Sequence, residues 1–537
     1  MRRCVPLITA AGAAAVLLTA TLAPAALAGG DTHKQSLRKA SSGDPYADCT
    51  AGATPNGVVY PGSEVEPFVS VDPRDGRRAV AVWQQDRWSD GGARGLAGAW
   101  TEDGRTFHQV TLPFTVCAPG GSDYERSSDP WVSTGPDGTV YASGLSHDVT
   151  TPRSAILATT STDGGRTWST PVATREDNDP AIFNDKPSIT ADPVRRGTAY
   201  QVWDRTEFFP TGPDAHVAGP AYLSVTRDGG RTWGPARPIV NNAALGPNAQ
   251  TFGNVIVVDP RSGTLYNFFT WITYADPTAE VVTDSRFAVV TSNDGGRTWS
   301  APVTVAPETS APEVHPNAPG TRLRAGAFVS SPAVDPKNGT LYLAYQGSDF
   351  SSGAYNQAQL VRSTDGGRTW SAPELISRPG VPAFSPAITV DKQGTVAVLY
   401  YDLRYLRPDD TTTLPTVYWL ASLPDGSTHR RGERRISPVF DWLQAPFAGG
   451  YFLGDYQGLA LKGKHAVRPA LTLTNTGTSN NPTDVHSGVF RIPRDGSARP
   501  RQEESRMRTP DARPAGHPPD HARPERYLVP QRTSRGG

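Results

Sequence analysis

Ser161-Thr162-Asp163-Gly164-Gly165-Arg166-Thr167-Trp168 is a phrase that the chain repeats, and this repetition decides the fold. Near-identical copies end at Trp233, Trp299 and Trp370, a shortened copy spans residues 101–107, and Ser422–Gly426 looks like a worn one. Recurrence of one phrase along a chain is the signature of a repeat architecture. The sequence therefore predicts a single repetitive fold rather than the several domains that 537 residues would suggest.

A second phrase, short and apolar, precedes each of these copies and ends in an Asp/Pro/Gly turn. Its copies begin at Glu66, Asp129, Lys186, Asn254, Ser331 and Ser385, and Asp455 opens a seventh unit that has no clear copy of the eight-residue phrase. A β-rich stretch such as Thr198–Trp203 or Thr340–Tyr345 follows, which makes each unit an antiparallel blade of four strands. We therefore predict an all-β fold, a β-propeller. Seven first-strand phrases favour seven blades, and six result if the first or last unit completes another blade.

The eight-residue phrase has a structural explanation as a hairpin turn. Its glycines supply positive φ angles, and its Asp and Ser/Thr oxygens can accept backbone N–H groups that the turn leaves unpaired. Its Trp can bury the ring while the N–H stays satisfied. We expect structural rather than catalytic roles for these residues: Asp163, Trp168, Asp228, Trp233, Asp294, Trp299, Asp365 and Trp370.

The two ends of the chain differ from the repeats. Residues 1–28, with an apolar stretch from Val5 to Leu22 and a small-residue site at 26–28, predict a secretory signal peptide and hence a secreted, extracellular protein. We expect residues 29–60 to be a flexible lead-in, residues 61–493 to form the propeller, and the Arg/Pro-rich residues 494–537 to be disordered.

Composition narrows the partners and the redox state. The formal net charge is zero and the basic residues are scattered, so nucleic acid is not an expected partner. No later segment has the apolar length that would span a membrane, and we expect a monomer. After export, Cys49 and Cys117 would form one disulfide, with two buried free thiols as the alternative.

The repeated phrase resembles the Asp-boxes of the sialidase and related BNR-repeat families, over roughly residues 60–490. This resemblance implies a propeller similar to exo-α-sialidases. It says less about activity, because similar boxes occur in xyloglucanases, in sorting receptors and in noncatalytic assembly factors.

Strand direction locates the face where a site would lie. The starts of first strands and the ends of second strands share one face, opposite the Asp-boxes. That face would carry Glu66, Asp129, Asp185 and Asp455-Tyr456, with the second-strand pairs Asp86-Arg87, Asp204-Arg205 and Asp402-Leu403-Arg404.

The sialidase resemblance implies roles for these residues. Sialidases use a Tyr nucleophile activated by a Glu, so Tyr456 or Tyr401 would attack, Glu66 would be the base, and Asp129 or Asp185 the acid. The family holds the substrate carboxylate with three arginines, the first in a Phe/Tyr-Arg-Ile-Pro phrase before the first box. The only such phrase here, Phe490–Pro493, follows the last repeat.

Arg87, Arg205 and Arg404 could replace that triad from the second strands, since guanidinium groups suit a carboxylate. The alternative is structural: repeated acids and arginines can be ion pairs that fasten neighbouring blades.

These observations lead to one leading functional hypothesis and two others. The first is a secreted, sialidase-like glycoside hydrolase that removes terminal sugars, sialic acid above all, from extracellular glycans. The second is a noncatalytic propeller that binds a glycan or a protein, and the third is a β-glucan or xyloglucan hydrolase with two carboxylates. No cofactor is required, no histidine pattern predicts zinc, and calcium could bind the acidic ring.

Overall fold

The computed structural model describes residues 37–424 and 432–493, which belong to one compact unit. Strands dominate it, and its only helical elements are the four-residue α1 (Asn242–Leu245) and two 3₁₀ turns, Asp349–Ser351 and Trp442–Gln444. The all-β prediction is confirmed. The signal peptide and the C-terminal tail lie outside the described residues, as do the last two residues, 425 and 426, of the worn copy.

Two large sheets hold the first half of the described chain. An eight-stranded sheet contains β2 (Glu64–Val71), β3 (Ala79–Arg87), β4 (Ala93–Thr101), β5 (His108–Thr111), β6 (Arg126–Thr134), β7 (Val140–His147), β8 (Ser154–Ser161) and β9 (Val172–Asp177). A nine-stranded sheet contains β10 (Ile182–Ala191), β11 (Ala199–Phe209), β12 (His216–Gly219), β13 (Ala221–Thr226), β14 (Arg237–Val240), β15 (Ala249–Val258), β16 (Leu265–Tyr274), β17 (Val282–Ser292) and β18 (Val303–Pro307). Apart from the short β12, strands that follow one another within each unit pair antiparallel.

Smaller sheets hold the second half. One has β21 (Ser331–Val334), β22 (Leu341–Gly347), β23 (Gln357–Ser363) and β24 (Glu374–Leu375). The next has β25 (Ala383–Val390), β26 (Val396–Asp402), β27 (Pro415–Leu423), β28 (Gly432–Arg435) and β29 (Phe440–Asp441). The last five-stranded sheet has β31 (Gly458–Leu461), β32 (Ala466–Thr474), β33 (Thr483–Ser487), β34 (Phe490–Arg491) and the N-terminal β1 (Arg38–Lys39).

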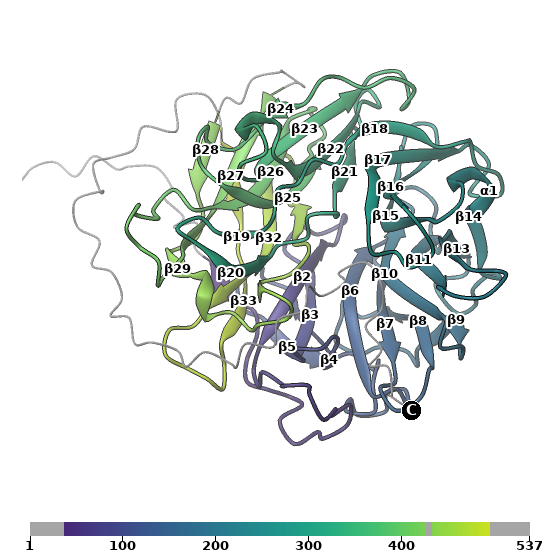
Figure 1. Cartoon of the computed structure of the whole chain (residues 1–537), viewed down its shortest axis with the longest axis horizontal. Coiled ribbons are helices and arrows are strands. Elements are labelled where there is room, and N and C mark those ends of the chain that lie inside the picture. Colours follow the sequence, from purple (N-terminus) through teal and green to yellow (C-terminus); the bar gives the residue numbers. More distant parts are fainter. Residues whose placement is uncertain (1–36, 425–431, 494–537) are drawn as a thin grey trace, which may run out of the picture. The chain divides into compact units, whose positions relative to one another are not determined.

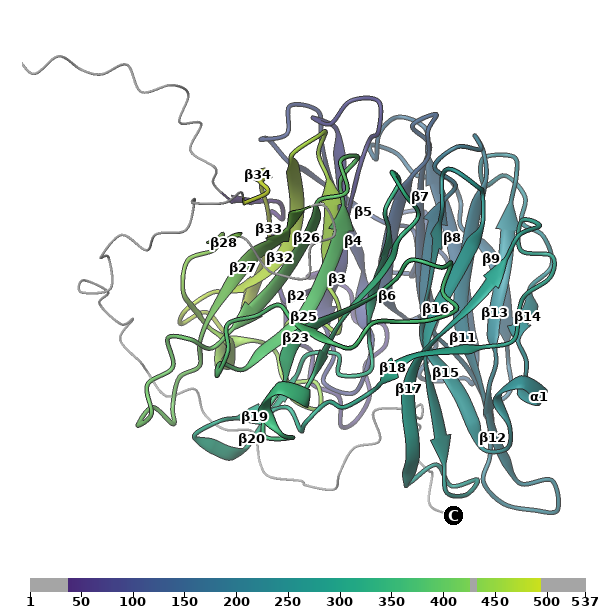
Figure 2. The same ribbon diagram turned by 90° about the horizontal axis from the view of Figure 1, so that it is seen from above.

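A separate small sheet is formed by two of the connections between units. It has β19 (Val314–His315), β20 (Ala318–Arg324) and β30 (Tyr451–Phe452), and β20 pairs parallel with β30. Figure 2 shows β12, β19 and β20 at the same edge of the strands, the lower edge in that view.

The first strands of successive units form a closed ring. In chain order these are β2, β6, β10, β15, β21, β25 and β31; each packs against the next, and β31 packs back against β2. Those labelled in Figure 1, β2, β6, β10, β15, β21 and β25, surround the centre of the view. Buried clusters of Val, Leu, Ile and aromatic side chains fill the space between neighbouring units, which is where the alternating apolar pattern places them.

A recurring bulge interrupts these first strands near their starts. The pairing slips by one residue in β2, β6, β10, β15 and β25, and the slipped residue has a positive φ: Glu66 at 52°, Asp129 at 54°, Lys186 at 46°, Gly253 at 65° and Ser385 at 47°. All but Gly253 precede a proline, although proline disfavours helical conformations in the residue before it. Such strained backbone costs about 1–3 kcal/mol per residue and persists only where its surroundings hold it.

The Asp-box turns are built as the sequence suggests. Asp163 Oδ1 accepts the backbone N–H groups of Arg166 and Thr167, both at 3.0 Å, and Gly164 and Gly165 have φ angles of 80° and 94°. These hydrogen bonds outweigh burial and lower the pKa of Asp163 to about 2. The four tryptophans differ in their indole hydrogen bonds. Trp299 and Trp370 donate to glycine carbonyls, whereas the buried N–H groups of Trp168 and Trp233 have no hydrogen-bond partner. The expectation that each Trp N–H is satisfied is therefore wrong for two of the four.

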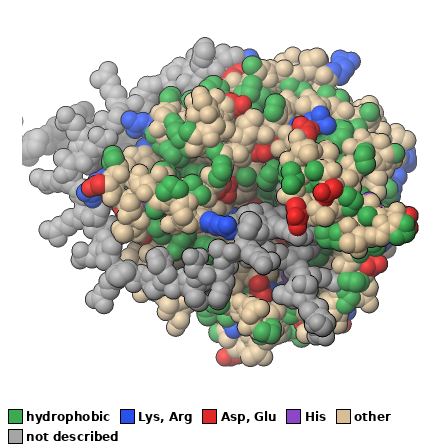
Figure 3. Space-filling model, viewed as in Figure 1, with side chains coloured by type: hydrophobic (Ala, Val, Ile, Leu, Met, Phe, Trp, Pro, Cys, Tyr) green, Lys and Arg blue, Asp and Glu red, His purple; other side chains and the backbone are tan. Residues whose placement is uncertain are grey.

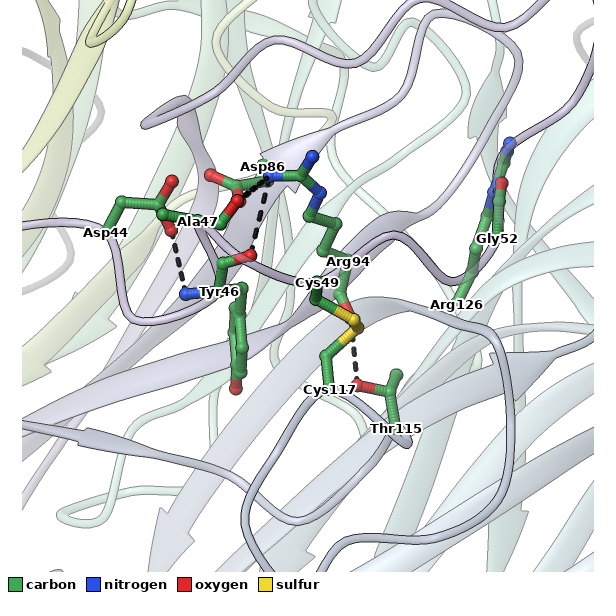
Figure 4. Close-up of a disulfide and its surroundings, with 10 residues drawn as sticks. All are labelled: Asp44, Tyr46, Ala47, Cys49, Gly52, Asp86, Arg94, Thr115, Cys117 and Arg126. Atoms are coloured by element: carbon green, nitrogen blue, oxygen red, sulfur yellow. Dashed lines mark hydrogen bonds and ion pairs between the residues drawn. A yellow bond between two sulfur atoms is a disulfide. The ribbon is translucent and has the colours of Figure 1, made fainter.

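The N-terminal segment is fixed from residue 38 onward. β1 pairs with β33, Tyr46 is buried and donates to the Leu96 carbonyl, and Cys49 is disulfide-bonded to Cys117 with a Cα–Cα distance of 5.6 Å. Figure 4 shows the disulfide beside Arg94, whose guanidinium reaches Asp86 and the backbone of this segment. The expected flexible lead-in is thus wrong for residues 38–49, because strand pairing, burial and a covalent bond compensate for its polar composition.

Within the described residues, no helix has the length and apolar character needed to cross a membrane. Figure 3 shows Lys/Arg and Asp/Glu side chains interspersed over the described part of the visible face, without a large patch of one sign.

Candidate functional site

Lys186 is the centre of the site. Its ammonium group, Nζ, lies 2.6 Å from Asp455 Oδ2, 2.7 Å from Asp129 Oδ1 and 3.3 Å from Glu66 Oε1. Lys186 is only 8% exposed, and the three carboxylate residues are buried at least as deeply. One cation therefore joins acids from three different parts of the ring.

The bulges explain how these side chains meet. Glu66, Asp129 and Lys186 occupy the same slipped position in β2, β6 and β10, so the left-handed backbone turns their side chains to one place. Asp455 lies just before β31 and completes the group, and its backbone N–H donates to Glu66 Oε1 at 3.2 Å. The strain of three bulges is thus concentrated at one cluster, which is common at functional sites.

The carboxyl groups around Lys186 differ in their affinity for protons. Burial raises the pKa of Glu66 to about 7, against the opposing effect of Lys186. Burial also raises the pKa of the half-buried Asp185 to about 7, with Asp129 adding to the effect. Burial acts on Asp455 in the same sense, but Arg324 and Lys186 outweigh it and hold its pKa well below the usual value. The site thus combines an ionised carboxylate with acids that can be protonated near neutral pH.

Two arginines lie beside this cluster. Arg324, at the end of β20, forms a bidentate pair with Asp455 at 2.9 and 2.6 Å. The guanidinium carbons of Arg324 and Arg87 lie 4.4 and 5.1 Å from the centre of the Phe452 ring. Arg87 donates to Gln84 through Nη1, and its buried Nε has no hydrogen-bond partner. Because buried donors are normally satisfied, this free N–H is a candidate contact for a ligand.

Glu313 adds a further acid near Arg324. It lies just before β19; its Oε1 accepts from Gln346 Nε2 and its Oε2 from the Ala325 N–H, both at 2.6 Å. Burial raises the pKa of Glu313 to about 7. It interacts electrostatically with Asp455, Arg324 and Tyr401, so it belongs to the same region.

The structure separates the two tyrosines that were expected as nucleophiles. Tyr456 lies over Lys186, with Nζ 5.8 Å from the ring centre, and donates its hydroxyl to the Pro130 carbonyl at 3.0 Å. Tyr401 is buried, and its hydroxyl has no partner among the described residues. Burial raises the pKa of both far above 10. Glu66 contacts Lys186, Gln84 and the Asp455 backbone, and no hydrogen bond joins it to either tyrosine.

The expected set of three second-strand arginines is wrong. Arg205 is bound by Asp177 at 2.9 and 3.0 Å and also pairs with Glu207. Arg404 is bound by Asp402 and Glu433 and stacks on Trp419 at 3.4 Å. These carboxylates hold the two guanidinium groups at separate places, and within the described residues neither group contacts Lys186 or the three carboxylates around it. Only Arg87 of the three lies at the cluster.

Three residues of the site were not predicted: Lys186, Arg324 and Glu313. A signal existed for Lys186, because it precedes Pro187 as Glu66 precedes Pro67 and Asp129 precedes Pro130. Arg324 and Glu313 come from the irregular connection between β18 and β21, which has no repeat motif that could have indicated them.

The sequence suggested that calcium could bind the acidic ring. In the structure the Lys186 ammonium group lies among these carboxylates and supplies the positive charge there. No group of three or more His, Cys, Asp or Glu side chains in residues 37–424 and 432–493 could hold a metal ion.

Comparison with known proteins gives partial matches. Residues 221–406 match the family model described as BNR repeat-like domain. A sialidase from Micromonospora viridifaciens is 31% identical over 178 residues, which cover 31% of this chain and 26% of the sialidase. The match thus spans about a quarter of that relative's length.

Several solved structures are similar at low identity. A Hadza microbial sialidase has 14% identity and a TM-score of 0.44, covering 82% of this chain and 94% of its own. The α-L-arabinanase of Penicillium chrysogenum has 13% identity and a TM-score of 0.43, and the match covers 85% of this chain and 98% of the arabinanase. A NanB sialidase mutant from Streptococcus pneumoniae has 10% identity and a TM-score of 0.43, and the match covers 81% of this chain and 94% of the sialidase. Residues 221–406 of the chain thus match a BNR repeat-like domain, and part of the chain is similar to a sialidase.

Proposed function

We propose that the protein is a secreted, sialidase-like glycoside hydrolase that removes a terminal anionic sugar from extracellular glycans. The observation that carries the proposal is the convergence of Asp129, Asp455 and Asp185 around Lys186, beside Arg324 and Arg87. Acids of unequal proton affinity beside a pair of guanidinium groups are what hydrolysis of a carboxylated sugar requires.

Asp185 is our candidate for the general acid. It is the most accessible of the acids around Lys186, and its raised pKa keeps a protonated fraction at pH values up to about 7. A protonated carboxyl group can donate to the leaving oxygen of the glycosidic bond.

Arg324 and Arg87 are our candidates for binding the substrate carboxylate. Both guanidinium groups lie against Phe452, and the unpartnered Nε of Arg87 is a donor ready for an anionic oxygen. Arg87 remains from the set expected on the second strands, and Arg324 takes the place of Arg205 and Arg404.

For the nucleophile we propose Tyr401, with Glu313 as its base in place of Glu66. The free hydroxyl of Tyr401 and its electrostatic coupling to Glu313 support this choice. Tyr456 fits less well because its proton is committed to the Pro130 carbonyl.

We further infer that the closed ring of first strands is the core of a seven-bladed β-propeller. Seven first strands in continuous contact, each followed by antiparallel neighbours, support this count. Secretion is supported by the Cys49–Cys117 disulfide, because such bonds persist mainly in oxidising compartments.

The direct test is hydrolysis of a fluorogenic sialoside by the purified protein between pH 4 and 8, alongside a neutral arabinoside. We expect turnover of the sialoside that falls at least about 100-fold in Asp185→Asn and Tyr401→Phe. Asp228→Asn, in an Asp-box, is the matched control and should retain activity. Absence of sialoside turnover by the wild-type protein, with a known sialidase active in the same assay, would refute the proposal.

A second candidate, a noncatalytic propeller that binds glycans, is favoured by one observation. The charged residues of the cluster are all less than 10% exposed: Glu66, Asp129, Lys186 and Asp455. Such burial is expected of ion pairs that hold neighbouring strands of the ring together. Saturable binding of a sialylated glycan without turnover, abolished by Arg87→Met, would support this candidate over the first.

A further inference from the structure

A second group of polar side chains lies where β22 and β23 meet their connecting hairpin. Tyr345 and Gln359 pair directly across the two strands, as do Gly347 and Gln357, so all four share one face of the sheet. The Tyr345 hydroxyl, Gln357 Oε1 and both amide atoms of Gln359 are buried without a hydrogen-bond partner. Buried polar atoms of this kind are rare, and four on one face point to a bound ion or water.

Two carboxylates border the same place. They are Asp349, in the hairpin, and Glu308, just after β18. Burial raises the pKa of Glu308, and the charge of Asp349 adds to this effect. Neither carboxylate forms an ion pair with a Lys or Arg of the described residues. Thr309 lies between them and donates to Asp349 Oδ2 at 2.9 Å. Negative charge therefore gathers here without a protein cation, in contrast with the cluster at Lys186.

These groups converge beside Gly347, whose lack of a side chain lets them approach one another. A Cβ atom at Gly347 would lie 2.8 Å from Thr309 Oγ1, 3.0 Å from Gln359 Nε2 and 3.3 Å from Asp349 Oδ2. Because no hydrogen bond fixes the Gln359 amide, its oxygen can equally face this space. Three oxygen donors from three chain segments can then surround one point.

We propose that this space binds a calcium ion, held by Asp349, Thr309 and Gln359 with Glu308 nearby. Calcium prefers carboxylate, hydroxyl and amide oxygens in a flexible arrangement, and water can complete its coordination. Two carboxylates with neutral oxygens make this a weak site of the extracellular kind, with an expected dissociation constant of about 10⁻⁴–10⁻³ M.

The position gives the ion a structural consequence. The chain runs from Glu308 and Thr309 directly to Glu313, and Gln346, next to Gly347, donates to Glu313 Oε1. Calcium would therefore fasten the segment that carries Glu313 toward Asp455 and Arg324. The calcium site itself does not depend on the proposed hydrolase activity.

Calorimetric titration of the metal-stripped full chain with calcium chloride tests the proposal, with thermal unfolding as a second measurement. We expect saturable binding and a higher melting temperature in calcium. Asp349→Asn, which removes a ligand charge, and Gly347→Ala, which fills the space, should each weaken binding at least tenfold. Gly347 has no positive φ, so alanine should not strain the backbone there.

Asp276→Asn is the matched control, because Asp276 is also an exposed hairpin carboxylate but accepts only from Thr278. It should bind calcium like the wild type. Unchanged melting temperatures of the variants without calcium would show that they fold. The proposal is overturned if the wild type binds no calcium at a calcium concentration about tenfold above the expected dissociation constant. It is also overturned if both variants bind calcium as tightly as the wild type does.

Discussion

The carboxylates around Lys186 and those of the Asp-boxes are the same chemical groups in opposite surroundings. Asp163 lies in a turn where backbone N–H groups and hydroxyls donate to it, and its pKa falls to about 2. Glu66 is buried on a bulged strand, and its pKa rises to about 7. The difference shows that donors supplied locally make an acid structural, whereas burial beside other charges leaves it able to exchange protons.

The largest expected effect comes from removing the cation that joins the buried acids. Lys186→Met should lower the free energy of unfolding by about 3–5 kcal/mol, because the buried Glu66 and Asp129 would lose their cation and only Asp455 would keep one, Arg324. Urea denaturation followed by tryptophan fluorescence measures this. Lys392→Met, at an exposed turn, should change stability by less than about 0.5 kcal/mol. A loss below about 1 kcal/mol in Lys186→Met would show that the cluster is not held by its charges.

The next effect separates function from stability. If Asp185 is the acid of the proposed hydrolase, Asp185→Asn should reduce kcat/KM at least about 100-fold, or about 2.7 kcal/mol, while the unfolding midpoint hardly moves. Asp185 accepts only the N–H of its neighbour Lys186, so little packing depends on its charge. A variant that loses stability and activity in parallel would contradict a chemical role.

The pH dependence of stability should have opposite signs in the two regions. The raised pKa of Glu66 means that the folded state binds a proton more tightly than the unfolded state, so this contribution is complete below about pH 4.5 and is lost as the pH rises through about 7. The lowered pKa of Asp163 contributes stability above about pH 4 that is lost as the pH falls toward 2.

Urea denaturation at pH 5, 6, 7 and 8 can isolate the first contribution. Glu66→Gln should flatten the decline in stability by up to about 1.4 kcal/mol per pH unit. An unchanged slope would mean that Glu66 does not titrate in this range.

The smallest effect is expected at an Asp-box. Asp163→Ala should cost about 1 kcal/mol, because the turn loses the acceptor of two backbone N–H groups that water can partly replace. Any hydrolytic activity should be retained. Loss of activity in this variant without loss of stability would overturn the division between the two regions.

The sequence predicted much of the fold because its signals are local. The eight-residue phrase contains its own turn, with glycines at positive φ and an Asp that caps the backbone beside it. The apolar phrases before it became the first strands of the ring, and the acidic positions Glu66, Asp129 and Asp455 were correctly placed together.

The site was predicted less well because its partners are distant in sequence. Arg205 and Arg404 occupy positions similar to that of Arg87, yet carboxylates on their own or nearby strands bind them. The neighbouring Glu207 and Asp402 supply only part of the neutralising charge, and the other carboxylates, Asp177 and Glu433, come from other strands that the local sequence does not reveal.

By itself, the sequence determined the all-β repeat, the turns and which acids start the first strands, because each depends on residues a few positions apart. Only the tertiary structure decided that Lys186 enters the acidic cluster, that Arg324 joins Asp455 from 131 positions away, and that Arg205 and Arg404 do not take part. The physical reason is that charge pairing and burial depend on distance in space, which closure of the ring sets and short-range patterns do not.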